Sequence, residues 1–153
     1  MFKRFSIAIA AILSMSPVAK ASMLEDYIYS NPVLEAVHSS GTRILFKDPS
    51  CDGSLYGSYN SKTDVMVLCI ATHPDLEELG DTIRHETIHI IQTCNGGPIL
   101  SLAKLFEFAK PVDYQFISNY PNIKQHIELE AHIGARSMTD TQVATHFTNA
   151  CLS

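Results

Sequence analysis

The 153-residue sequence has few basic residues and no cluster of them: eleven Lys and Arg stand against sixteen Asp and Glu. Three of the basic residues and none of the acidic ones fall within residues 1–21. This leaves eight basic and sixteen acidic residues, a net charge of −8, in the remainder. An acidic surface repels the phosphates of nucleic acids and the headgroups of anionic lipids. The composition therefore excludes nucleic acid and anionic membranes as the main partners.

Beyond its first residues, the sequence also lacks any apolar run that approaches the ~20 residues of a membrane-spanning helix. It contains no internal repeat, no low-complexity stretch and no interdomain linker. We therefore predict a single domain over residues 22–153, a length that is typical of one domain. We predict no integral membrane segment in it.

The first 21 residues have the three parts of a secretory signal peptide. Lys3 and Arg4 form a basic start, and residues 5–15 form an apolar core that is too short to span a membrane. Ala19-Lys20-Ala21 then provides an A-x-A cleavage site. We predict cleavage after Ala21 and export of residues 22–153 to the periplasm or out of the cell.

The four cysteines do not form the C-x-x-C pairs that are typical of metal clusters. In an oxidising compartment, an even number of cysteines predicts disulfides. Three sets of pairs can be drawn. We favour Cys51 with Cys69, which closes a hairpin, and Cys94 with Cys151, which ties the C-terminus to the end of a helix.

The most informative residues are His85-Glu86-Thr87-Ile88-His89, an H-E-x-x-H sequence. On an α-helix, residues i and i+4 lie on one face, so both imidazoles can reach one Zn²⁺ ion at about 2.0–2.1 Å. Glu86 is placed to reach a water molecule beside the ion, where a carboxylate acts as a general base. The motif predicts a hydrolase with one zinc ion held by His85 and His89.

The neighbouring residues predict that the motif lies on a helix over residues 74–94. Thr72 is the predicted N-cap, and Pro74 lies in the first turn. Apolar residues then recur at helical spacing, and Asn95-Gly96-Gly97-Pro98 ends the helix. Gln92 shares the less apolar face with the two histidines.

A third ligand is expected from a second helix, predicted over 121 to about 138 from its apolar stripe. Within it, Glu128-Leu129-Glu130-Ala131 matches E-x-x-A and resembles the second helix of the gluzincins, zinc metallopeptidases with a Glu ligand. The resemblance implies that Glu128 is the third zinc ligand, with Glu130 as the alternative. Gluzincins often have Asp where this sequence has His132. His132 and His126 therefore remain further alternatives.

The order of cysteines and motifs is similar to that of the mitochondrial intermembrane-space metalloproteases that act on an ATP synthase subunit. That family has a cysteine-flanked hairpin, an H-E-x-x-H helix followed by Cys, and an E-x-x-A helix. The corresponding features lie within residues 51–135. The likeness implies a shared architecture, and it carries no information about the substrate.

Short strands are predicted over 43–47, 55–60 and 65–70, after a helical segment at 23–40 that breaks at Asn31-Pro32. Further helices are predicted at 99–109 and 140–150. With the gluzincin resemblance, this order indicates an α+β, zincin-like fold. We expect a small N-terminal antiparallel sheet, followed by the zinc-motif helix and the ligand-bearing helix.

These features predict a secreted zinc metallopeptidase that acts on a peptide or protein substrate. Glu86 would take a proton from the attacking water and pass it to the leaving amine. The sheet edge Val65–Cys69 would hold an extended peptide by strand addition. The candidate oxyanion donors are Tyr114, Tyr120, His126 and His146. The alternative function is a secreted zinc-binding or disulfide-stapled interaction domain without catalytic activity.

Overall fold

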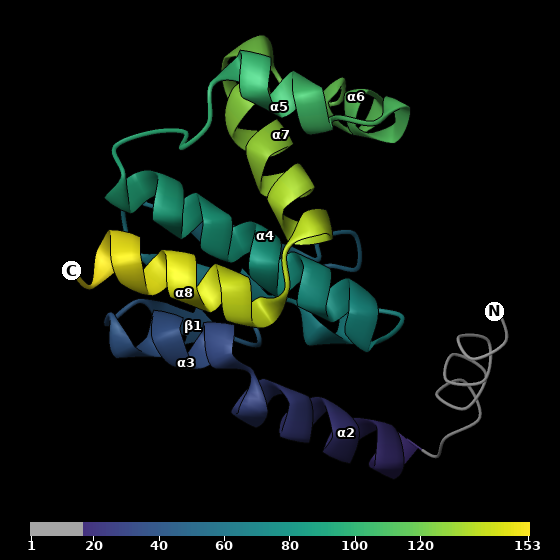
Figure 1. Ribbon diagram of the computed structural model, residues 1–153. Coiled ribbons are helices and arrows are strands. Elements are labelled where there is room, and N and C mark those ends of the chain that lie inside the picture. The colour runs from purple at the N-terminus through teal and green to yellow at the C-terminus, as the bar shows by residue number, and fades with distance from the viewer. Residues whose placement is uncertain (1–16) are drawn as a thin grey trace, which may run out of the picture.

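The computed structural model describes residues 17–153, and their side chains from Ser22 onwards (Figure 1). Residues 1–16, most of the predicted signal peptide, lie outside the described residues, so the signal peptide stays a prediction. Helix α2 (Pro17–Ser30) runs through the predicted cleavage site. Among the described residues, no helix combines the length and the apolar character needed to cross a membrane.

The break at Asn31 between α2 and α3 (Pro32–Ser39) is confirmed, and it has a local cause. Asn31 Oδ1 accepts hydrogen bonds from the backbone N–H groups of Val33 and Leu34 at 3.0 and 3.3 Å. These bonds satisfy donors that the first turn of a helix leaves free. Pro32 fits that turn because its missing N–H is not needed there.

The sheet has three short strands, β1 (Arg43–Leu45), β2 (Gly57–Asn60) and β3 (Val65–Leu68), in the order β1-β3-β2. Strands β2 and β3 form the predicted antiparallel hairpin, but β1 pairs with β3 in parallel. The prediction of an antiparallel sheet is therefore wrong for β1. The prediction assumed that consecutive strands pair, but β1 skips β2 and pairs with β3.

The sheet order also corrects the predicted substrate edge at Val65–Cys69. Strand β3 is the central strand and has a partner on each side, so its backbone is not free to pair with a peptide. Its continuous apolar run of buried residues fits that central position. The free edge beside helix α4 belongs to β2, which packs against that helix.

Five α-helices follow the sheet: α4 (Leu76–Cys94), α5 (Leu102–Phe108), α6 (Pro111–Ile117), α7 (Asn122–Ser137) and α8 (Asp140–Cys151). Helix α8 packs against both α3 and α4, and these three lie side by side in Figure 1, while α7 packs across α4. The α+β class and the helices at the motif, at 121–138 and at 140–150 are confirmed. Helix α6 was not predicted, because Pro111 was not recognised as the first residue of a new helix after the break at Ala109.

Helix α4 begins two residues later than predicted. Its N-cap is Asp75, whose Oδ1 accepts from Glu78 N–H at 2.9 Å, and not Thr72. Thr72 instead ends the short 3-10 helix η1 (Ile70–Thr72), where its hydroxyl donates to the carbonyl oxygens of Leu55 and Cys69. The prediction confused two polar residues that both suit a helix start.

The main hydrophobic core lies between the sheet, α3, α4 and α8, and it includes Val37, Leu68, Ile83 and Phe147. A second, smaller cluster joins α5 and α6 to α7 and consists of Leu105, Ile117, Leu129 and Ile133. We call residues 101–118, which hold α5 and α6, the α5–α6 lobe. This small core lies between the lobe and α7 and is separate from the main one.

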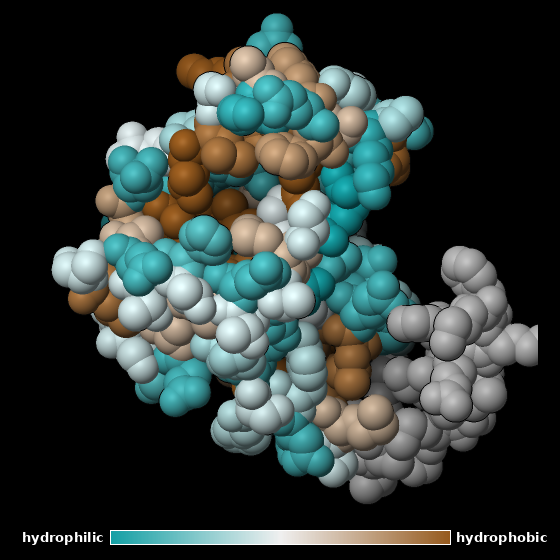
Figure 2. Space-filling model, viewed as in Figure 1, coloured by the Kyte–Doolittle hydropathy of each residue, from teal (hydrophilic) through white to brown (hydrophobic). Residues whose placement is uncertain are grey.

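The α5–α6 lobe and the residues beside it expose much apolar surface. Figure 2 shows hydrophobic residues gathered at the top of the molecule, where Figure 1 places this lobe. Of the twelve large hydrophobic side chains that are exposed among the described residues, eight lie within 99–123. They are Ile99, Leu100, Leu102, Phe106, Phe108, Val112, Tyr114 and Ile123. The small core of the lobe leaves these side chains uncovered, so polar contacts must contribute to holding it in place.

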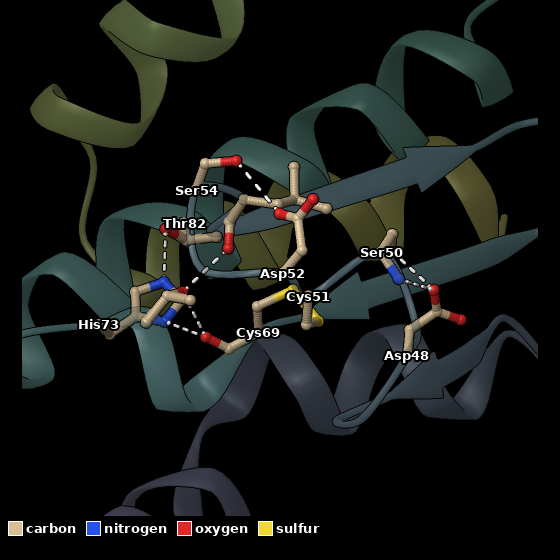
Figure 3. The surroundings of a disulfide bond; sticks show 10 residues. Asp48, Ser50, Cys51, Asp52, Ser54, Cys69, His73 and Thr82 are labelled. Carbon is tan, nitrogen blue, oxygen red and sulfur yellow. Dashed lines mark hydrogen bonds between the residues drawn. A yellow bond between two sulfur atoms is a disulfide. The ribbon is translucent and has the colours of Figure 1, made fainter.

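Both predicted disulfides are present, Cys51–Cys69 and Cys94–Cys151. Disulfides persist in oxidising compartments, so the pair indicates an extracellular or periplasmic setting. Next to the first disulfide, His73 is buried between the carbonyl oxygen of Cys69 and the hydroxyl of Thr82, at 3.0 and 2.9 Å (Figure 3). His73 thereby connects the end of β3 to the middle of α4.

Candidate metal centre

Helices α4 and α7 bring three side chains together. His85 and His89 lie one turn apart on α4, and Glu128 reaches them from α7. The nitrogen and oxygen atoms that these residues offer lie within 4.8 Å of one another, so the group could hold a metal ion. All three side chains are partly buried, which limits competition from solvent.

The distances within the group fit a small tetrahedral ion. His85 Nε2 lies 3.1 Å from His89 Nε2, and Glu128 Oε2 lies 3.4 and 3.5 Å from these two nitrogens. Ligands about 2.0–2.1 Å from a tetrahedral ion are roughly 3.3 Å from each other. Two imidazoles and one carboxylate are also a donor set that catalytic zinc sites use, with a fourth position left for water. The residues therefore fit a zinc ion.

Glu130, the alternative ligand, faces a different set of atoms. It is only 5% exposed, and its carboxylate accepts hydrogen bonds from the backbone N–H groups of Ile99 and Leu100 and from the Gln92 amide. Residues two apart on a helix point about 200° away from each other around its axis. Glu128 and Glu130 consequently cannot face the same partners.

The two alternative histidines also lie outside the group. His126 Nε2 donates to the carbonyl oxygen of Leu100 at 2.8 Å. His132 Nε2 lies 3.2 Å from Asp113 Oδ1, and its ring stacks on Phe116 at 4.0 Å. Both rings are occupied with other partners, and neither belongs to the group that could hold a metal.

Gln92 sets the orientation of the His89 ring. The amide nitrogen of Gln92 donates to the Ile127 carbonyl oxygen at 3.0 Å and to Glu130 Oε2 at 2.8 Å. Both of these atoms can only accept, so the amide oxygen must be the atom that faces His89 Nδ1, at 2.8 Å. The neutral His89 ring therefore carries its proton on Nδ1, and its Nε2 lone pair then points toward His85 and Glu128. Such outer contacts are how proteins fix the tautomer of a metal-binding histidine.

Glu86 is 7% exposed and packs between the two histidines and the sheet edge. Burial raises its pKa above the usual range, although the charges of His85 and His89 and the backbone N–H of Tyr59 act in the opposite direction. A Cβ atom added to Gly57 on β2 would lie 3.2 Å from Glu86 Cγ and 2.6 Å from Thr82 Cγ2. Only glycine at this position lets the strand approach the motif helix so closely.

Glu128 and His89 have strongly coupled charges. Burial raises the pKa of Glu128, but hydrogen bonds from His85 and His89 outweigh it and hold this pKa at about 2. Burial lowers the pKa of His89, whereas its bond to Glu128 and the charge of Glu86 raise it above the usual value. The group thus contains an ionised carboxylate, which favours a positive charge beside it.

Two cavities open on either side of the group. One, of about 520 Å³, is lined by His85, Glu86, Tyr120 and His132 among others. The other, of about 380 Å³, is lined by His89, Glu128, Tyr59 and Lys124 among others. The candidate ligands therefore line two separate cavities, His85 one and His89 and Glu128 the other.

Of the four predicted oxyanion donors, only Tyr120 lines a cavity next to Glu86. Tyr114 stacks on Phe106 in the α5–α6 lobe, and His146 lies exposed on α8. Gly57 and His132 also line this cavity, and neither was predicted to do so. The spacing of His132, four residues after Glu128, places both on one helical face and would have identified it.

No protein-family model matches the chain. No curated protein and no solved structure matches it either. Only the residues themselves therefore bear on the function.

Proposed function

We propose that the protein is a zinc-dependent metallopeptidase that acts outside the cytoplasm. The observation that carries this proposal is the burial of Glu86 directly beside a His-His-Glu group whose spacing suits zinc. A purely structural metal site has no need for a fourth, non-ligating carboxylate. The gluzincin resemblance of the two motifs supports the same function.

His85, His89 and Glu128 would hold the zinc ion, and Glu86 would act as the general base. When bound, zinc lowers the pKa of a water molecule toward about 7 and polarises a carbonyl group. Glu86 would take a proton from the attacking water and pass it to the nitrogen of the leaving amine. Its burial against Gly57 holds the carboxylate in place for both transfers. Tyr120 is the proposed hydrogen-bond donor to the oxyanion.

Strand β2 is the proposed binding edge for the substrate. Tyr56 O accepts from Cys69 N–H at 2.9 Å, so Tyr56, Ser58 and Asn60 face β3 in the alternating pattern of an antiparallel pair. The backbone groups of Gly57 and Tyr59 consequently point away from β3. The N–H of Tyr59 faces Glu86, and the other outward groups are the ones proposed to pair with a substrate strand. An extended peptide paired there would pass along both cavities.

The proposal is tested by measuring zinc content and peptide cleavage of the oxidised protein, wild type beside Glu86→Gln. We expect one zinc per chain in both proteins. We expect cleavage of an unstructured protein substrate, such as casein, by the wild type alone, since loss of a general base lowers rates about 10²–10⁴-fold. Glu107→Gln, at an exposed site on α5, is the matched control and should cleave normally.

Two outcomes would contradict the proposal. Wild type that folds, forms both disulfides and binds no zinc would leave a disulfide-stapled interaction domain. Wild type that binds zinc, but cleaves no faster than Glu86→Gln on a broad set of peptides and proteins, would leave a secreted zinc-binding module.

A further inference from the structure

The polar contacts of Glu130 extend from the candidate metal centre to the segment before the α5–α6 lobe. Its carboxylate accepts from Ile99 N–H at 2.9 and 3.0 Å and from Leu100 N–H at 2.6 Å. On its other side it accepts from the Gln92 amide at 2.8 Å. All of these donors are neutral. A nearly buried carboxylate that is held only by N–H groups depends on each of them.

Gln92 connects this carboxylate to the metal centre. Because its amide nitrogen is committed to Glu130 and to the Ile127 carbonyl, its oxygen is turned toward His89 Nδ1. Without Glu130, the amide could rotate and offer its nitrogen to His89, which would favour the tautomer with a proton on Nε2. That tautomer cannot bind a metal through the nitrogen that faces Glu128.

The same contacts place the chain that leads into the α5–α6 lobe. Residues 95–101 leave α4 and enter α5, and Glu130 and His126, which donates to Leu100 O, hold this segment against α7. The lobe has only a small core and a largely exposed apolar surface. The lobe itself is held against α7 by that core and by the bond from Arg136 to the buried Asp113, whereas the bonds at residues 99 and 100 place the segment that leads into it.

We propose that Glu130 and Gln92 are positioning residues that couple zinc binding at His89 to docking of residues 98–101 on α7. The inference rests on the metal centre of the proposed function and adds a regulatory link to it. When residues 98–101 are docked, Glu130 and Gln92 are ordered and His89 is in its metal-binding tautomer. When zinc is bound, His89 is fixed, and the remaining bonds form at a lower entropic cost. Such coupling is reciprocal: docking strengthens zinc binding as much as zinc stabilises docking.

The first test is the zinc affinity of Gln92→Leu, measured by competition with a chelator. We expect affinity about 10–100-fold weaker than wild type, the usual effect of removing an outer contact to a metal ligand. Gln92→Met is a second variant that keeps the side-chain length if Leu disturbs folding. Gln115→Leu, on the exposed face of α6, is the matched control and should bind zinc like wild type.

The decisive test is amide hydrogen exchange at Ile99 and Leu100, in the zinc-free and zinc-saturated protein. In the wild type, we expect zinc to slow exchange at these two amides by about 5-fold or more, the lower end of typical coupling between sites. In Gln92→Leu saturated with zinc, this slowing should disappear, although the metal is bound. A merely structural role for Gln92 would speed exchange equally with and without zinc.

The outcomes separate this inference from the proposed function. Zinc that binds to the wild type without slowing exchange at Ile99 and Leu100 would overturn the coupling and leave the metallopeptidase intact. The same slowing in wild type and Gln92→Leu would also overturn it. A wild type that binds no zinc would overturn the metal centre and the coupling together.

Discussion

The contact between α4 and α7 has two ends, and the polar side chains at these ends have different surroundings. At one end, which we call the cleft end, His85 and Glu86 line one cavity and Glu128 lines another. At the other end, which we call the loop end, Glu130 accepts hydrogen bonds from the Gln92 amide and from two backbone N–H groups. Both ends have buried carboxylates on the same pair of helices. Burial alone therefore does not distinguish a candidate reactive carboxylate from a structural one. Their hydrogen-bond partners do.

The largest expected difference between the two ends is in zinc binding. Glu128→Ala should weaken zinc affinity on the order of 100-fold or more, since structural sites gain ~10–16 kcal/mol from about four ligands. Titration against a chelator of known affinity measures this effect. Glu130→Ala should still take up one zinc at saturation. Complete loss of zinc in Glu130→Ala, with Glu128→Ala unaffected, would reverse the two assignments.

The second largest difference is expected in the free energy of unfolding, where Glu130→Ala should be the more damaging variant. Glu130→Ala removes the acceptor of three buried or half-buried N–H donors, and each unsatisfied donor costs about 1–3 kcal/mol. We expect a loss of about 3 kcal/mol in the free energy of unfolding of the zinc-free protein, measured in urea. Zinc-free Glu128→Ala should lose clearly less. Equal losses would mean that the loop end has no special structural role.

A smaller change is expected from Gly57→Ala, which adds a methyl group at the cleft end. The new Cβ would lie too close to Thr82 Cγ2 and would press on Glu86. Overpacking of this kind costs about 1–3 kcal/mol of stability. We expect kcat to fall more than zinc affinity, because the base moves while the ligands stay. Gly53→Ala, in the loop before β2, is the comparison for backbone strain without crowding, because its φ of +101° disfavours a side chain although no atom lies within 4 Å.

The smallest effect should come from His73, which lies on the sheet side of α4. Burial lowers its pKa below 6.5, and this outweighs the hydrogen bonds to the Cys69 and Ile70 carbonyls that raise it. A lowered histidine pKa gives stability that is present above pH 6.5 and is lost as the pH falls through the folded value. Unfolding free energies from pH 8 to pH 5 should therefore fall more steeply in wild type than in His73→Gln. The same pH dependence of the unfolding free energy in both proteins would contradict a lowered pKa of His73.

Local patterns were sufficient to predict much of this molecule. The helical spacing around His85 and His89 identified α4, and the break at Asn31-Pro32 was correct because a cap and a proline act within one turn. Both disulfides followed from the count and order of the cysteines. The group of His85, His89 and Glu128 also came together as the two motifs predicted.

What could not be predicted depends on contacts between distant segments. The parallel pairing of β1 with β3, and hence the free edge at β2, depends on how residues 46–56 cross the sheet. The role of Glu130 depends on where Ile99 and Leu100 come to lie, 30 residues or more away in the sequence. A sequence shows two similar glutamates on one helix, and only their surroundings distinguish them.

The disulfide between Cys94 and Cys151 has a consequence for how the metal centre assembles. Along the chain, Glu128 is separated from His89 by 39 residues. The disulfide offers a second covalent path, through Cys94 and Cys151, with 28 residues in all. Two tethers confine the distance between two points of an unfolded chain more than one does. Oxidation thus brings the third ligand closer to the histidines before folding is complete, and disulfide formation should precede and favour metal uptake.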